Sequence, residues 1–293
     1  MTTVLPKPGL SAAARGAMWM VAGGFCYVGA SVCIRLLAQH YSVLMIVFVR
    51  CIIALAFIAP VLSQLKLREL RTNRLSIHLL RAFLSWAGMM GWFYAVKVIP
   101  ISDYYALAFL TPIFTVAMAV TILHERSTVT TWITIGVGFL GALIVLRPGF
   151  SAINAGMIGA VIGAAAFAAV NLCVRVASRE DRGIVIVMYV NLLLLPLSGI
   201  VAAFDWTTPA LEHVPLFLGA GVFATLGQLF LTWAVGLADA RIVQPFDFCR
   251  LPISAVVGWV LFREATDIWT WIGAVVIFVS AYYALQAERR ARA

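Results

Sequence analysis

Charged residues are scarce in this sequence. Asp, Glu, Lys and Arg make up 11% of its 293 residues, whereas soluble domains contain roughly 25%. Hydrophobic residues make up 63%, and apolar runs of about 18 to 22 residues follow one another with only short polar breaks. This composition excludes a soluble fold and predicts an all-α integral membrane protein.

Motifs for catalysis and for metal binding are also missing. The sequence has no Gly-x-Ser-x-Gly, no His-Glu-x-x-His and no Walker loop. Its four histidines are far apart, and its five cysteines lie in apolar runs without Cys-x-x-Cys spacing. We therefore expect no enzyme, no catalytic residue, no cofactor and no bound metal.

Ten apolar runs have the length and composition of membrane spans. A helix needs about 20 apolar residues to cross the hydrocarbon core of a bilayer. The predicted spans cover residues 17–37, 43–62, 79–98, 102–123, 129–146, 156–176, 184–204, 214–236, 241–262 and 267–286.

The second half of the chain repeats the plan of the first half. A shift of 139 residues aligns Glu125 with Glu264 and Trp132 with Trp271. The sequence therefore predicts two repeats, residues 1–149 and 150–293. Each repeat has five spans, and because five is odd the second repeat enters the membrane from the opposite side. Such inverted repeats are typical of transporters that work by alternating access around a central cavity.

The net charge of +9 reflects topology rather than a nucleic-acid partner. If both termini are cytoplasmic, fourteen Lys and Arg lie in inside segments and only five in outside segments or nearby helix ends. Positive charge favours the cytoplasmic side and the anionic lipid there. We expect a multi-pass protein of a bacterial inner membrane with both termini in the cytoplasm. Membrane lipid is the expected macromolecular environment, and a homodimer is left open.

The segment QPFDFCRLP in the ninth span carries the deepest charges of the sequence. Asp247 and Arg250 are three residues apart, within reach of each other on a helix, and Pro245 and Pro252 flank them. Ionisable groups at membrane depth are candidate functional residues. Two interpretations stay open, a structural ion pair and contact with a substrate.

Other polar and aromatic residues lie on helix faces that we expect to point inward, because unsatisfied polar groups are costly in lipid. Arg50, inside the second span, either pairs structurally, reaches the interface or contacts substrate. The residues predicted to line the cavity are Tyr27, Trp92, Tyr105, Phe109, Asn171, Gln228, Gln244, Asp247 and Arg250, with Ser31, Arg50, Arg81, Trp86 and Trp233 as further candidates.

The sequence resembles the EamA-type branch of the drug/metabolite transporter superfamily. The resemblance rests on the two five-span repeats, on the segment from Ala108 through Pro112 to Glu125 and Trp132, and on the glycine-rich fifth span with Arg147-Pro148-Gly149 after it. It implies a basket of helices around a central cavity lined mainly by spans 1, 3, 4, 6, 8 and 9, with spans 5 and 10 bracing it from outside.

We expect a secondary transporter of a small amphipathic metabolite. An adjacent acid and base suit a zwitterion, so an amino acid or an amino-acid derivative is the favoured substrate. A riboflavin-like cofactor or a nucleoside is the alternative, because aromatic side chains stack on flat rings. A membrane scaffold or a membrane enzyme is the competing class of function, and the sequence offers little for either.

Overall fold

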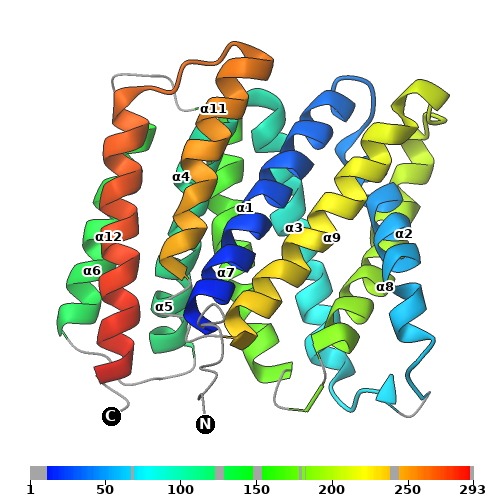
Figure 1. The fold of residues 1–293 in the computed structure, drawn as a ribbon, viewed down its shortest axis with the longest axis horizontal. Coiled ribbons are helices and arrows are strands. Elements are labelled where there is room, and N and C mark those ends of the chain that lie inside the picture. The colour runs from blue at the N-terminus through cyan, green and yellow to red at the C-terminus, as the bar shows by residue number, and fades with distance from the viewer. Residues whose placement is uncertain are drawn as a thin grey trace, which may run out of the picture.

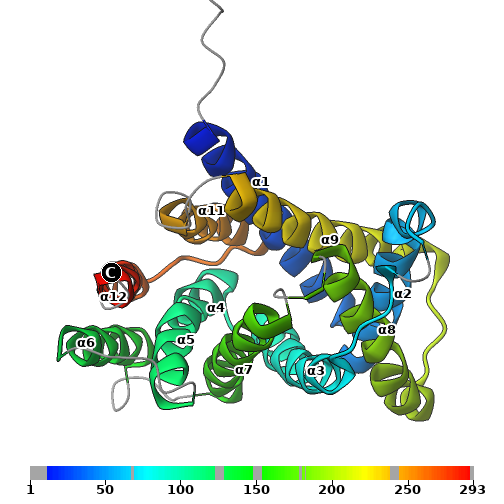
Figure 2. The same cartoon turned by 90° about the horizontal axis from the view of Figure 1, so that it is seen from below.

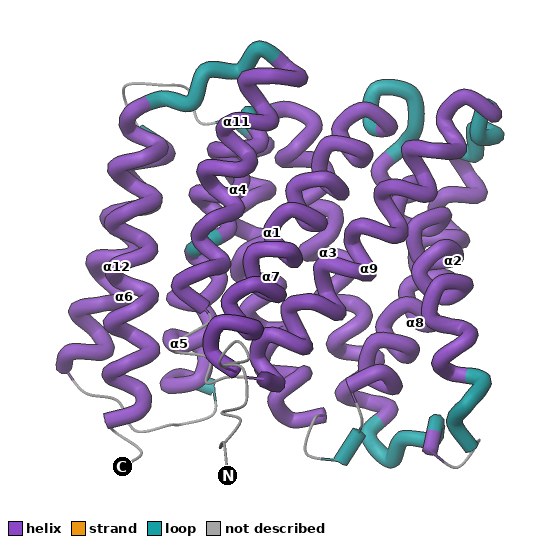
Figure 3. Tube along the Cα trace, in the orientation of Figure 1, coloured by secondary structure: helices purple, strands orange, loops and turns teal. Residues whose placement is uncertain are grey.

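The computed structural model describes residues 12–66, 69–122, 129–147, 154–177, 180–181, 183–237 and 244–290. These residues form helices and connecting turns, with no strand among them (Figure 3). Five of the helices are long and apolar enough to cross a membrane, and shorter apolar helices accompany them. The predicted all-α membrane fold is confirmed at this level. The count of ten membrane crossings stays a prediction.

The helices coincide with the ten predicted spans. The first repeat contains α1 (Ala12–Leu37), α2 (Val43–Leu62), α3 (Leu75–Val98), α4 (Ile101–Ala108), α5 (Leu110–Thr121) and α6 (Val129–Leu146). The second repeat contains α7 (Ala155–Ala177), α8 (Gly183–Ala202), the short 3₁₀ helices η2 (Ala203–Asp205) and η3 (Leu211–His213), α9 (Val214–Leu237), the 3₁₀ helix η4 (Gln244–Cys249), α11 (Arg250–Phe262) and α12 (Ile268–Arg290).

The fourth and ninth spans are each broken at the same place in the repeat. Phe109 separates α4 from α5, and 140 residues later Cys249 ends η4, where α11 begins. Pro112 and Pro252 follow the two breaks closely. Proline lacks a backbone N–H and disturbs the preceding helical turn, so both breaks have a local cause in the sequence.

The packing of the helices follows the internal repeat. The most extensive contacts join α1 to α9, α3 to α7, α2 to α8 and α6 to α12. A shift of 140 residues turns α1 into α7 and α3 into α9, so the first two contacts are equivalent, and each of the other two joins a helix to its own counterpart. This is the arrangement that a pseudo-two-fold axis produces. In Figure 2, α6 and α12 lie side by side at one edge of the bundle.

The two repeats are inverted. Gly156, near the start of α7, lies beside Val98 and Ile99 at the end of α3. Asp181, just beyond the end of α7, bonds to His78 at the start of α3. Helix α7 is therefore antiparallel to α3, and hence to α1. The first turn of α1 and the last turn of α12 lie at the same end of the bundle (Figure 1), which we call the terminal end.

Glycines let the paired helices approach closely. An added Cβ on Gly141 of α6 would lie 3.0 Å from the carbonyl oxygen of Gly273 on α12. Gly136, Gly138 and Gly141 have the Gly-x-Gly-x-x-Gly spacing of a nucleotide-binding turn. Here they lie inside a helix. At least Gly141 serves helix packing, as small residues do in membrane bundles.

Polar contacts tie the two repeats together at both ends. At the terminal end, the His78 ring and the Thr72 hydroxyl both bond to Asp181, and Arg74 pairs with Glu180.

At the opposite end, Arg35 of α1 pairs with Glu264 in the turn between α11 and α12. The Arg35 guanidinium lies 4.6 Å from the centre of the Phe262 ring, and Glu264 accepts a hydrogen bond from the backbone N–H of Ile101. Both ends are therefore bridged across the repeat boundary.

Candidate functional site

The charged pair of the ninth span lies against the first helix. Arg250 pairs with Asp247, with 2.6 Å between Nη2 and Oδ1. The Arg250 guanidinium also lies 4.3 Å from the centre of the Tyr27 ring on α1, a cation–π contact. Because Asp247 is in η4 and Arg250 opens α11, the change of helix type occurs between the two charges. The pair thus lies at the boundary between the repeats.

A chain of aromatic rings continues from Tyr27 into the first repeat. The ring centroids of Tyr27 and Trp92 are 6.4 Å apart, and Trp92 stacks on Tyr104 at 6.1 Å. Tyr104 contacts Tyr105 at 5.1 Å, and the Tyr105 hydroxyl lies 3.0 Å from the Ser31 hydroxyl. Helices α1, α3 and α4 therefore supply one continuous aromatic surface, which we call the aromatic cluster: Tyr27, Trp92, Tyr104 and Tyr105.

Two glycines leave room for these large side chains. A Cβ on Gly24 would lie 2.9 Å from the Cys249 sulfur and 3.3 Å from Cγ of Arg250. A Cβ on Gly227 of α9 would lie 3.1 Å from the Tyr27 ring. Alanine at either position would therefore displace a side chain of the site.

A second aromatic group lies at the two helix breaks. Phe109 and Phe248 are counterparts in the repeat, and their ring centroids are 4.9 Å apart. Phe248 also contacts Phe278 of α12 at 4.5 Å. Because counterparts meet at a pseudo-two-fold axis, this contact places the axis between the two broken spans.

The two predicted arginines of the second and third spans are buried but have different surroundings. Arg50 is 6% exposed, and its Nη2 donates to Oδ1 of Asn191 at 3.4 Å. Arg81 is 3% exposed and donates from Nη1 to the Ile186 carbonyl at 2.6 Å. Arg50 acts electrostatically on the Tyr27 hydroxyl, as Arg250 does. Arg50 therefore borders the aromatic cluster, whereas Arg81 holds α3 to α8.

Other predicted residues lie elsewhere. Trp233 is 46% exposed and packs on Trp19 near the start of α1, with ring centroids 5.1 Å apart. Trp86 is partly buried beside Phe83, and Asn171 is exposed on α7. Gln228 is partly buried on α9, and the side chain of Gln244 lies outside the described residues.

A family model for EamA-like transporters matches residues 14–147 and 154–286, which together cover both repeats. The chain belongs to the EamA-like transporter family. The prediction of a transporter rather than an enzyme is thereby confirmed, as is the place in the drug/metabolite transporter superfamily. This EamA-like protein is a multi-pass bacterial membrane protein.

Curated relatives cover nearly the whole transporter. It is 32% identical to a riboflavin transporter of Vibrio cholerae over 285 residues, which is 94% of each chain. It is 31% identical to a riboflavin transporter of Rhizobium johnstonii over 283 residues, 96% of this chain and 94% of the other. It is 29% identical to an S-adenosylmethionine uptake transporter of Rickettsia bellii over 222 residues, 76% of each chain.

A solved crystal structure shares the fold. Its TM-score is 0.59 at 18% sequence identity, and the alignment covers 94% of this chain and 98% of the other. At that identity the likeness supports the arrangement of the helices alone.

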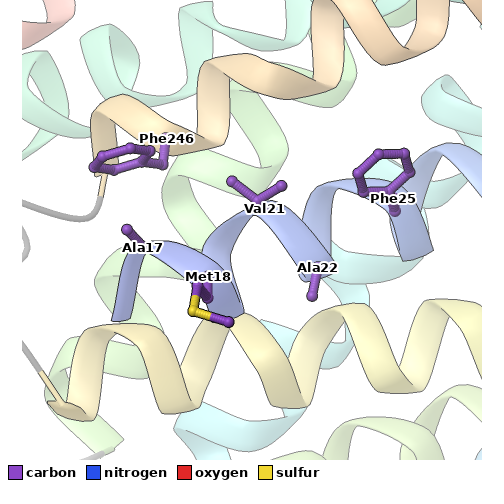
Figure 4. Close-up of a pocket in the computed structure, with 6 residues that line it drawn as sticks. All are labelled: Ala17, Met18, Val21, Ala22, Phe25 and Phe246. Carbon is purple, nitrogen blue, oxygen red and sulfur yellow. The ribbon is translucent and has the colours of Figure 1, made fainter. Parts of the chain in front are cut away.

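An apolar groove lies on the transporter's surface, apart from the charged pair. Its volume is about 440 Å³, and it is lined by Ala17, Met18, Val21, Ala22, Phe25 and Phe246 (Figure 4). Metabolite sites combine apolar walls with a few polar groups that fix orientation. The groove has no polar side chain in its lining, so we place the candidate substrate site at the aromatic cluster instead.

Sequence reasoning left out residues that the transporter brings to the site. Tyr104 was not among the predicted lining residues, although the pattern of the repeat contains it, and it stacks on Trp92. Asn191 comes from the seventh span and reaches Arg50 across the repeats. The offset of 141 residues between them, close to that of the repeat, was the signal that could have indicated Asn191.

Proposed function

We propose that this protein is a secondary transporter of a flat, riboflavin-type metabolite, working by alternating access. The aromatic cluster beside the charged pair carries the proposal. Four aromatic rings from three helices surround one point between the repeats, and offset stacking on flat rings is favourable. Relatives that match over nearly the full length are named riboflavin transporters.

The amino-acid substrate expected from the sequence has less support. Asp247 and Arg250 were expected to offer a free acid and a free base to a zwitterion. In the structure they pair with each other at 2.6 Å. A pair that is already satisfied needs no zwitterion, and binding one would require the pair to separate.

The proposed topology places the terminal end in the cytoplasm. The loops at that end contain Lys66, Arg71 and Arg74, and positively charged residues favour the cytoplasmic side. With ten crossings, both termini lie on that side. Transport across the bacterial cytoplasmic membrane then requires the Arg35–Glu264 end and the terminal end to open alternately.

Counterflow in proteoliposomes tests this function. Vesicles loaded with unlabelled riboflavin are expected to take up labelled riboflavin, and amino acids or S-adenosylmethionine in the lumen serve as comparisons. Trp92→Ala removes a stacking partner worth about 1 kcal/mol, which raises the KM roughly fivefold. Trp92→Phe is expected to restore most of the affinity.

Trp132→Ala is the matched control, because Trp132 is 48% exposed on α6 and outside the aromatic cluster. Its transport should equal that of the wild type. Counterflow of amino acids without counterflow of riboflavin would overturn the proposed substrate.

A further inference from the structure

Hydrogen-bond donors around Tyr27 outnumber the acceptors available to them. The Nε1 of Trp92, the Nε of Arg50 and the Nε of Arg250 are buried, and none has a hydrogen-bond partner in the described part of the chain. Buried polar groups are nearly always satisfied in folded proteins, and exceptions call for an explanation. All three atoms are donors, so a ligand that satisfies them must bring acceptors.

Arg50 is the least compensated of these groups. A guanidinium has five N–H donors, and the hydrogen bond that Arg50 donates to another polar side chain is the 3.4 Å contact with Asn191. Among the described residues no carboxylate lies within ion-pair distance of Arg50. An intramembrane charge of this kind faces a cavity or a partner rather than lipid, and the neighbouring Tyr27 identifies the cavity side.

The charges near Tyr27 do not balance. Arg250 is neutralised by Asp247 at 2.6 Å, whereas Arg50 has only the neutral amide of Asn191. The site therefore has one uncompensated positive charge. In a low-dielectric interior such a charge strongly disfavours a second cation and favours electron-rich atoms.

We propose that Arg50 is the specificity-determining residue of the site, binding the acceptor-rich edge of a neutral or anionic substrate and excluding cations. The inference rests on the proposed function, in that the aromatic cluster binds the substrate. Carbonyl oxygens and ring nitrogens of a flavin-type heterocycle provide such an edge. A sulfonium ion of the S-adenosylmethionine type has a fixed positive charge, so Arg50 makes it a poor substrate.

Direct binding to the purified protein tests the proposal without relying on transport. The probes are riboflavin, riboflavin 5′-phosphate and S-adenosylmethionine, with flavin binding followed by fluorescence quenching and S-adenosylmethionine binding by calorimetry. The wild type is expected to bind both flavins and to bind the sulfonium at least tenfold more weakly. Arg50→Gln should weaken flavin binding by on the order of tenfold to a hundredfold, as loss of a charge-assisted hydrogen bond does.

Arg81→Gln is the matched control. Arg81 is as buried as Arg50, but it lies eleven residues before Trp92 on α3, about 16 Å along the helix, and its partner is a backbone carbonyl. Its Kd for riboflavin should stay within twofold of the wild type. Arg50→Lys keeps the charge and should still reject the sulfonium, whereas Arg50→Glu should bind it better than the wild type does.

The outcomes separate this inference from the proposed function. If Arg50→Gln binds riboflavin as the wild type does while Trp92→Ala does not, the site is correct and the role of Arg50 is refuted. If the wild type prefers the sulfonium to both flavins, the charge argument fails, and so does the proposed substrate. If Arg50→Gln does not fold, the preference of the wild type and the behaviour of Arg50→Lys still decide the question.

Discussion

Gly273→Ala is expected to separate α6 from α12. An ideal Cβ at position 273 would lie 2.6 Å from the carbonyl oxygen of Gly141 and 3.1 Å from the backbone N of Val145. The first distance is about 0.8 Å short of the 3.4 Å at which ordinary contact begins. Both atoms belong to the backbone, so no change of rotamer relieves the clash, and the two helices must move apart. Overpacking typically costs ~1–3 kcal/mol, and the rigid neighbours favour the upper end of that range.

A loss of about 3 kcal/mol corresponds to a fall of roughly 5–10 °C in the melting midpoint of a chain of this size. The assay is the apparent midpoint in detergent, read as the fraction of protein that stays monodisperse after heating at a fixed rate. Gly136→Ala on α6 is the control, since a Cβ there meets nothing within 4 Å, and it should melt like the wild type or slightly higher. Equal midpoints for Gly273→Ala and Gly136→Ala would show that α6 and α12 are not in backbone contact.

Three further predictions use the same melting assay. Arg35→Gln and Glu264→Gln should each destabilise the protein by about 2–3 kcal/mol, because each leaves one partly buried charge unpaired; the double variant should lose less than the sum, and strict additivity would contradict the pair. Tyr105→Phe and Ser31→Ala should each cost about 1 kcal/mol and share that cost in the double variant, since they remove the same hydrogen bond. The hydrogen bond from its arginine partner lowers the pKa of Glu180 below the ordinary 4.5, so its contribution is present above pH 4.5 and is lost as the pH falls through the folded-state pKa. Glu180→Gln should therefore flatten the acid limb of a plot of midpoint against pH, and an unchanged limb would refute this role.

The bridges at the two ends of the bundle bear on alternating access. A transporter that opens to one side at a time must break polar contacts between its repeats at that side. The Arg35–Glu264 pair and the His78–Asp181 pair each join residues from different repeats. They are thus the contacts whose rupture the two open states require, and their stability sets how readily each end opens.

The sequence by itself determined the class, the repeat and the family of this protein. Long apolar runs can satisfy their backbone hydrogen bonds only within helices, so hydropathy predicts the spans without tertiary information. The inversion follows from the odd number of spans per repeat. Pro112 and Pro252 mark the helix breaks because the missing N–H acts on the chain's own preceding turn.

The tertiary structure decided which polar residues share a site. Sequence reasoning predicted the facing Asp247 and Arg250 because an interval of three residues is local on a helix. It could not place Tyr27 against Arg250, or Asn191 against Arg50, because those contacts join residues more than 140 positions apart. Glu264 shows the same limit: an interfacial cap or a pair with its neighbour Arg263 was expected, yet its partner is Arg35. Helix rotation and close approach at glycines fix such contacts, and both depend on packing against the other repeat.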